Sequence, residues 1–218
     1  MRPFVSALQA QMLLPLSRAL FPVEGAQFDA HHAFMVRYKA GEDLGLDMHT
    51  DDSDVTVNVC LGKEGFRGAG LTFCGVMATS AHRKLSHVYG HELGRAVVHL
   101  GNQRHGADDI RSGERHNLII WNHNHAYRNS HPARKRLDRY DGEAGPPDPQ
   151  CLSYTHDRDY GEFKPYPPGK AHFAGRAWCP PRHACYDTME PIDTLGFRRK
   201  QTPGDRLGLE QVAPRTDL

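Results

Sequence analysis

Apolar residues near the start of the chain recur at helical spacing. Between Pro3 and Leu20 they occupy positions Phe4, Val5, Leu8, Met12, Leu13, Leu16 and Leu20. This spacing predicts a helix that packs one side against a sheet. We expect a break or kink at Pro15, because proline has no backbone N–H and its ring clashes with the preceding helical turn. Residues 1–30 are therefore interpreted as helical support for a following domain.

From residue 33 onward the pattern changes to the period of two that is typical of β-strands. In Ala33 to Lys39 the alternate positions Phe34, Val36 and Tyr38 share one face. In the run 55–61 apolar residues alternate with Thr56, Asn58 and Cys60 in the same way. Further strand-like runs cover residues 71–74, 86–89, 95–100 and 116–121, with turn-rich loops at 41–48 and 62–70. Short strands at this spacing favour a sandwich or barrel.

Three residues at the edges of these runs have the chemistry of a metal site. His49 and Asp51 are two positions apart, so in an extended chain both side chains project to the same side. We expect His105, which follows the run 95–100, to lie at a glycine-containing bend and to complete the group. Two imidazoles and one carboxylate on one face of an iron ion leave its other positions open, as a catalytic site requires.

Arg115 lies ten residues after His105 and opens the strand-like run 116–121. A guanidinium is suited to bidentate capture of a carboxylate, so we predict a site for a dicarboxylic co-substrate beside the metal. One H-x-D motif is expected by chance in a chain with 15 histidines. The alternative is therefore that these residues lie on surface loops, and their position beside predicted strands favours the site.

The segments 34–41, 49–51, 54–61 and 113–121 resemble the catalytic domain of Fe(II)- and 2-oxoglutarate-dependent oxygenases of the prolyl and lysyl hydroxylase group. Within that group, residues 30–125 are most similar to the 2-oxoglutarate and iron-dependent oxygenase domain-containing proteins. The resemblance implies a mainly β domain over residues 31–127, a double-stranded β-helix or jelly roll. It also implies that His49, Asp51 and His105 bind iron and that Arg115 binds the distal carboxylate of 2-oxoglutarate.

Two further residues are candidates for co-substrate binding. Tyr38 corresponds to a tyrosine near the co-substrate in the family, although it lies two residues further from the first histidine than in prolyl hydroxylases. Asn58 is on the strand face that would point toward the site, where it contacts the co-substrate or substrate, or makes a cross-strand hydrogen bond.

The resemblance implies a hydroxylase that releases succinate and carbon dioxide and uses ascorbate (vitamin C) as an auxiliary reductant. The expected substrate is a proline or lysine in a protein or peptide, with a small molecule as the alternative. Two other classes remain open, namely a catalytically inactive jelly-roll binding module and a cupin-like metal protein that uses no keto acid.

Composition narrows the range of partners. The 27 basic and 26 acidic residues give a net charge of +1, which offers no general attraction to nucleic acid or to an anionic membrane. No apolar run approaches the roughly 20 residues that cross a bilayer, and Ser6, Gln9 and Gln11 interrupt the first apolar stretch. We therefore expect an intracellular protein, cytoplasmic or nuclear, or one of the endoplasmic reticulum if the chain is a fragment.

Residues 128–218 read as an irregular C-terminal extension, rich in basic residues and then in glycine and proline. The five cysteines form no recognisable disulfide framework. Cys179, His183 and Cys185, with Cys151 or His172, match no standard zinc finger, so we favour ordinary buried or free thiols. His123 and His125 have no carboxylate near them in the sequence and are interpreted as solvated.

Overall fold

The computed structural model describes residues 2–77, 79, 81, 83–130, 147–153 and 169 of the chain. It opens with three consecutive helical segments, α1 (Arg2–Leu8), the π-helical η1 (Gln9–Leu13) and α2 (Leu14–Leu20). The backbone N–H of Leu14 donates to the carbonyl of Gln9, five residues earlier. This wide turn directly precedes Pro15, whose ring excludes the normal α-helical path. The predicted interruption is therefore present, as a π-helical segment.

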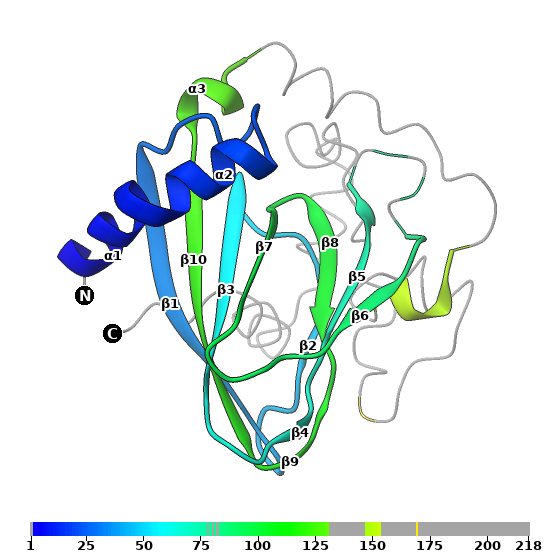
Figure 1. Ribbon diagram of the computed structural model, residues 1–218. Coiled ribbons are helices and arrows are strands. Elements are labelled where there is room, and N and C mark those ends of the chain that lie inside the picture. Colours follow the sequence, from blue (N-terminus) through cyan, green and yellow to red (C-terminus); the bar gives the residue numbers. More distant parts are fainter. Residues whose placement is uncertain are drawn as a thin grey trace, which may run out of the picture.

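Ten strands follow in the described part of the chain, and eight of them form two four-stranded antiparallel sheets (Figure 1). The first sheet has the order β1 (Ala30–Lys39), β10 (Glu114–His123), β3 (Val55–Gly62) and β7 (Ala96–Leu100). The second has the order β2 (Leu46–His49), β8 (Gln103–Ala107), β5 (Leu71–Val76) and β6 (His87–Tyr89). The short strands β4 (Arg67–Gly68) and β9 (Ile110–Ser112) pair separately.

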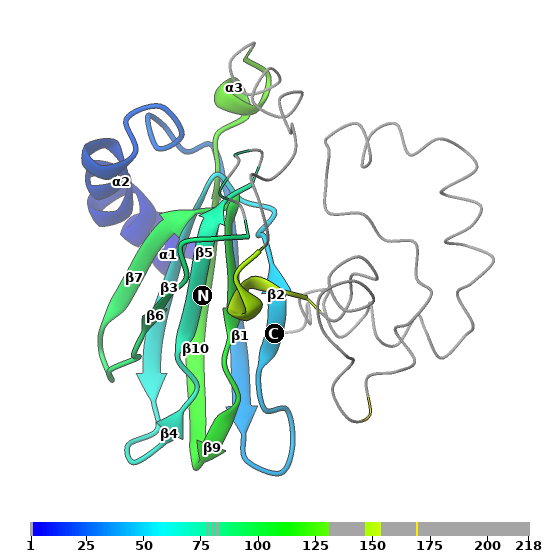
Figure 2. The ribbon, with the colours of Figure 1, turned by 90° about the vertical axis from the view of Figure 1, so that its right-hand side faces the viewer.

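The chain passes repeatedly from one sheet to the other, because β2 and β3, like β7 and β8, are consecutive strands in different sheets. In Figure 2 the second sheet faces the viewer and its strands overlap those of the first. This winding is that of a jelly roll. The predicted fold class, mainly β with a flanking N-terminal helix, is confirmed.

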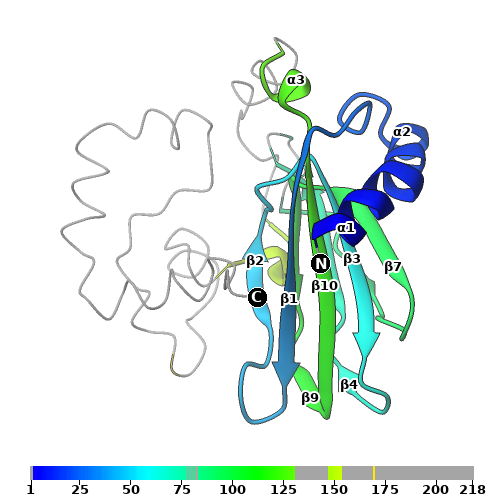
Figure 3. The same cartoon turned by 90° about the vertical axis from the view of Figure 1, so that its left-hand side faces the viewer.

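The N-terminal helices cover the outer face of the first sheet (Figure 3). Val5 and Leu13 are buried there against Val57 of β3 and Ile120 of β10. The opposite side of the helices exposes Phe4, Met12, Leu16 and Leu20. The predicted packing of this segment on a sheet is thus correct, but only about half of its apolar positions take part in it.

Three local predictions were wrong. His105 lies within strand β8 and not at a bend, part of the predicted loop 41–48 is strand β2, and the loop 62–70 contains β4. Strand β8 reads Gln-Arg-His-Gly-Ala and has no apolar alternation. It is extended because β2 and β5 pair with it on its two sides and supply hydrogen-bond partners for its backbone.

Residues 147–153 pack against the second sheet through the short helix η2 (Pro149–Cys151). Cys151 forms a disulfide with Cys74 of β5, and Arg104 Nε donates to the carbonyl of Cys151 at 2.9 Å. The expectation of free thiols is therefore wrong for this pair, because the fold brings together two cysteines 77 residues apart. Among the described cysteines, Cys60 is free and buried.

The disulfide also removes Cys151 from the zinc ligands that we considered. His172, Cys179, His183 and Cys185 lie outside the described residues, as does most of the predicted extension 128–218. The division into 1–30, 31–127 and 128–218 thus stays a prediction. Within the part of the chain that the structure covers, no helix has the length and apolar character needed to cross a membrane.

Candidate metal and co-substrate site

The three predicted metal ligands meet between the two sheets. His49 is the last residue of β2 and is the cross-strand partner of His105 on β8, while Asp51 follows β2 by two residues. Nε2 of His49 lies 3.4 Å from Oδ1 of Asp51, and Nε2 of His105 lies 3.7 Å from Oδ2. One ligand atom from each residue lies within 4.8 Å of the other two, and no other such group occurs among the described residues.

Backbone carbonyls orient both imidazole rings. Nδ1 of His49 lies 2.7 Å from the carbonyl oxygen of Asp47, and Nδ1 of His105 lies 2.8 Å from that of Gln103. A carbonyl oxygen only accepts hydrogen bonds, so Nδ1 carries a proton in each ring, and Nε2 is the ring nitrogen that faces Asp51. Histidines that bind metals typically have this second hydrogen bond. The donor set and its orientation therefore fit a divalent metal such as iron.

Asp51 is held from two directions. The hydroxyl of Thr56 donates to its Oδ2 at 2.6 Å, and its backbone N–H donates to the carbonyl of Gly101 at 2.8 Å. Gly101 lies so close to the loop that a Cβ there would be 1.9 Å from the carbonyl oxygen of Ser53. Only glycine fits at this contact, which joins the turn between β7 and β8 to the loop that carries Asp51.

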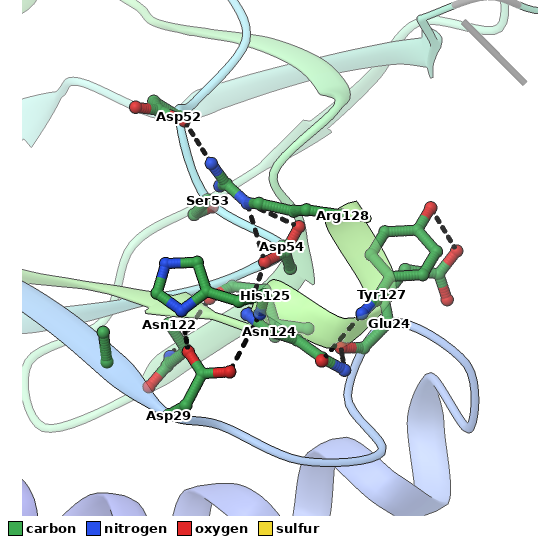
Figure 4. Close-up of polar contacts among 12 residues, drawn as sticks. Glu24, Asp29, Asp52, Ser53, Asp54, Asn122, Asn124, His125, Tyr127 and Arg128 are labelled. Carbon is green, nitrogen blue, oxygen red and sulfur yellow. Dashed lines mark hydrogen bonds and ion pairs between the residues drawn. The ribbon is translucent and has the colours of Figure 1, made fainter. Parts of the chain in front are cut away.

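The same loop is also tied to helix α3 (His125–Arg128), as Figure 4 shows. Arg128 Nε donates to Oδ2 of Asp54 at 2.9 Å, and its Nη1 donates to Oδ1 of Asp52 at 2.8 Å. Oδ2 of Asp54 also accepts from the backbone N–H of Asn124 at 2.6 Å. The residues directly after Asp51 are therefore held by a helix that follows the last strand, a role that we had not assigned to this basic segment.

The pKa shifts of His105 and Asp51 favour the deprotonated forms that bind a metal. Burial lowers the pKa of His105 to about 3, so this imidazole is neutral at neutral pH. Burial would raise the pKa of Asp51, but the neighbouring His105 and the hydrogen bond with His49 outweigh it and hold that pKa well below its usual range. Burial lowers the pKa of His49, but the hydrogen bond and the charge of Asp51 more than offset this effect, so its pKa is raised. A proton on His49 is thus the one that a metal must displace.

Arg115 lies near the N-terminal end of β10, on the inner face of the first sheet, which points toward the second sheet. Its side chain is fully buried. Its guanidinium lies 5.0 Å from the ring centre of Tyr38, its cross-strand partner on β1. The Nε and Nη1 atoms of Arg115 have no hydrogen-bond partner among the described residues. A buried cation with unpaired donors is costly unless an anion pairs with it, so this group fits a bound carboxylate.

The buried hydroxyl of Tyr38 faces the same interior. Burial raises its pKa above the ordinary value, and the charge of Asp51 acts in the same direction, while Arg115 opposes both. Tyr38 is therefore a neutral phenol and can donate a hydrogen bond.

Asn58 makes a cross-strand contact, the second of the two roles that we considered. Its Oδ1 accepts a hydrogen bond from Nδ2 of Asn117 on β10. His91, in the loop after β6, lies next to this pair, with Nε2 3.4 Å from the same amide nitrogen. Burial and then the charge of Arg115 lower the pKa of His91 to about 4. Asn58 thus helps to shape the interior beside Arg115.

Sequence reasoning missed several residues of this interior. Thr56, His91 and His99 were not singled out, although the alternation of the predicted strands 55–61 and 95–100 already placed Thr56 and His99 on a defined face. His91 lies in a loop with no pattern that could have identified it. His123 and His125 lie outside the group, and Nδ1 of His125 is 2.6 Å from a carboxylate oxygen of Asp29, a contact that the sequence did not reveal.

Comparisons with known proteins agree with the motifs, although no protein-family model matches the chain. The 2-oxoglutarate and iron-dependent oxygenase domain-containing protein 2 of Mus musculus is 41% identical over 128 residues, which are 58% of this chain and 36% of that protein. A protein of Arabidopsis thaliana with the same general description is 42% identical over 113 residues, which are 49% of this chain and 28% of that protein. The chain thus spans about a third of the length of the curated relatives that it matches.

Among solved structures, an oxidoreductase of the 2OG-Fe(II) oxygenase family from Burkholderia pseudomallei is 18% identical, with a TM-score of 0.41 over 56% of this chain and 55% of that chain. A prolyl-4-hydroxylase from Pseudomonas putida is 20% identical, with a TM-score of 0.40 over 52% of this chain and 60% of that chain. From the sequence identities, the chain is a homologue of the 2-oxoglutarate and iron-dependent oxygenase domain-containing proteins.

Proposed function

We propose that the chain is an iron- and 2-oxoglutarate-dependent dioxygenase that hydroxylates its substrate. The observation that carries this proposal is the pairing of two unusual groups inside one jelly roll. One is the convergent set His49, Asp51 and His105, and the other is the buried guanidinium of Arg115, whose Nε and Nη1 have no partner in the described part of the chain. A metal that has open coordination positions and a buried carboxylate receptor together match the needs of a keto acid that chelates iron.

Each residue has a defined task in this proposal. His49, Asp51 and His105 would hold ferrous iron, with their rings and carboxylate already oriented by Asp47, Gln103 and Thr56. The iron, when bound, couples oxidative decarboxylation of 2-oxoglutarate to succinate and carbon dioxide with hydroxylation of the substrate.

Arg115 would bind the distal carboxylate of 2-oxoglutarate through its unpaired Nε and Nη1 donors. The guanidinium lies over the ring of Tyr38, and the neutral hydroxyl of Tyr38 offers a further donor. Asn58 and Asn117 hold the adjacent strands together with their amide hydrogen bond. These residues orient the co-substrate and exclude water from it.

The test is production of succinate from 2-oxoglutarate by the protein loaded with Fe(II) under anaerobic conditions and then exposed to oxygen. The wild type should form succinate, and Asp51→Ala should form none. Arg115→Leu should lower the affinity for 2-oxoglutarate by about 100-fold or more, because it removes a buried charge-assisted contact. Arg111→Leu, which changes an exposed arginine of β9, is the matched control and should behave as the wild type.

The same measurements separate the other classes. A cupin-like metal protein would bind iron, and Arg115→Leu would leave its activity unchanged. An inactive binding module would form no succinate, with or without a bound metal. Either result would contradict the proposal.

For the substrate we propose a proline or lysine side chain in a peptide, in keeping with the resemblance of the motifs to the hydroxylase group. Succinate formation should rise when peptides that contain the correct residue are added, and mass spectrometry should find a 16-Da increase on that residue. A panel of small molecules run in parallel tests the alternative. Omission of ascorbate from the assay tests whether it acts as an auxiliary reductant.

A further inference from the structure

A third histidine lies beside the proposed metal ligands. His99 is on β7, and its cross-strand partner on β3 is Thr56, whose hydroxyl holds Asp51. The side chain of His99 is 7% exposed, and its ring centre lies 4.5 Å from that of His105. Phe73 packs against both rings, with ring centres 5.2 and 5.7 Å away. His99 therefore faces the same interior space as the ligand group.

The three histidines share one hydrogen-bond arrangement. Nδ1 of His99 lies 2.9 Å from the carbonyl oxygen of Leu100, and Nδ1 of His49 and of His105 lies against a backbone carbonyl two residues earlier in the chain. Because a carbonyl only accepts, Nδ1 of His99 carries the proton and its Nε2 has a lone pair. His99 is thus oriented as metal-binding histidines are, with Nε2 directed into the interior.

The Nε2 atom of His99 is buried and has no hydrogen-bond partner among the described residues. It lies 3.9 Å from Oδ2 of Asp51, which is too far for a hydrogen bond. Both atoms are acceptors, and although Oδ2 of Asp51 accepts from the hydroxyl of Thr56, no donor among the described residues reaches Nε2 of His99. Buried polar atoms are normally paired, and a group with protons to donate is therefore expected at this position.

We propose that His99 is a positioning residue of the metal centre, whose Nε2 would accept a hydrogen bond from a water molecule held beside Asp51 when a metal is bound. The inference rests on the proposed function, because it requires a metal bound by His49, Asp51 and His105. His99 is not itself a ligand, because the donor atoms that lie within 4.8 Å of one another come from those three residues only, in the described part of the chain.

Two substitutions separate this role from a structural one. In His99→Gln the amide oxygen can take the place of Nε2, whereas in His99→Asn the shorter amide reaches only to the place of Nδ1. A structural role, through the bond with the carbonyl of Leu100, predicts that asparagine is the better replacement. The proposal predicts that glutamine is better. His99→Phe, which keeps a ring and has no acceptor, replaces His99→Asn if the latter does not fold.

In the experiment, the full chain is titrated with Mn²⁺ alone, and calorimetry measures the affinity. Pulsed electron paramagnetic resonance then counts the imidazoles coordinated to Mn²⁺. We expect two coordinated imidazoles in the wild type and in every His99 variant. The affinity for Mn²⁺ should fall by about 10- to 100-fold in His99→Asn and His99→Phe, and should stay close to the wild-type value in His99→Gln. His87→Gln, at an exposed histidine of β6, is the control for a histidine change outside the site.

The outcomes are distinguishable. Three coordinated imidazoles in the wild type, falling to two in the variants, would make His99 a ligand and overturn the proposal. Equal affinity in all variants, or tighter binding by His99→Asn than by His99→Gln, would leave His99 with a structural role only. If the wild type binds no Mn²⁺ or Fe²⁺, the proposed function fails and the role of His99 fails with it.

Discussion

The two faces of the sheet β1-β10-β3-β7 differ in kind although the same strands form them. On the outer face Val57 and Ile120 pack under the N-terminal helices in a hydrophobic cluster. On the inner face the neighbouring positions Thr56 and Asn58 hold polar contacts, and Arg115 is buried with donors that no described residue pairs. Because successive side chains of a strand alternate, one strand can serve both purposes.

The contrast shows that neighbouring residues of one strand serve different purposes in this fold. One residue stabilises the fold on the outer face, and the next belongs to the candidate site on the inner face. Outer-face side chains gain free energy by leaving water, whereas the inner face has buried polar atoms that lack partners among the residues the structure describes. Inner-face substitutions should therefore change ligand affinity more than stability, and outer-face substitutions should do the reverse. Three predictions test this division, beginning with the largest expected effect.

Ile120→Ala should lower the free energy of unfolding by about 3 kcal/mol, because it leaves a cavity in the outer cluster where the side chain is fully buried. Urea unfolding measures this loss. The affinity of the folded variant for Mn²⁺ should be that of the wild type. A large loss of affinity would show that the two faces are coupled and would break the comparison.

Thr56→Val is the matching change on the inner face. It removes the hydroxyl that donates to Asp51 and keeps the shape of the side chain, so the affinity for Mn²⁺ should fall about tenfold. The free energy of unfolding should change by less than about 1 kcal/mol, because one hydrogen bond contributes little net stability. Thr56→Ser, which keeps the hydroxyl, should restore most of the metal affinity as measured by calorimetry.

The metal-free protein should lose about 1 kcal/mol of stability between pH 7 and pH 6. The pKa of His105 is lowered to about 3 and that of His91 to about 4, and burial also lowers the pKa of His99. The unfolded chain binds these protons near pH 6.5. Its proton uptake therefore exceeds that of the folded chain as the pH falls from there, and stability declines.

His49 acts in the opposite direction and reduces this effect, because its pKa is raised and its folded form binds the proton more tightly. Urea unfolding at a series of pH values, with a chelator present, measures the net change. Stability that is constant or rises as the pH falls from 7 to 6 would show that the buried histidines do not remain neutral.

The local sequence pattern was sufficient for the elements that carry their own apolar alternation. Strands β1, β3 and β10 and the N-terminal helices were predicted close to their observed positions, because each has one face that must leave water. Strand β8, which carries His105, was not predicted. Its polar residues are extended only because strands distant in the sequence pair with it.

By itself the sequence determined the kinds of groups available to the site, namely H-x-D, a later histidine and an arginine, because residue type and short spacing are local properties. Which further side chains face them was decided by the tertiary structure. The pairing of β3 with β7 places His99 beside Thr56, and the turn at Gly101 holds the loop of Asp51. Burial and the absence of hydrogen-bond partners depend on contacts between distant segments, and those arise only when the chain closes into two facing sheets.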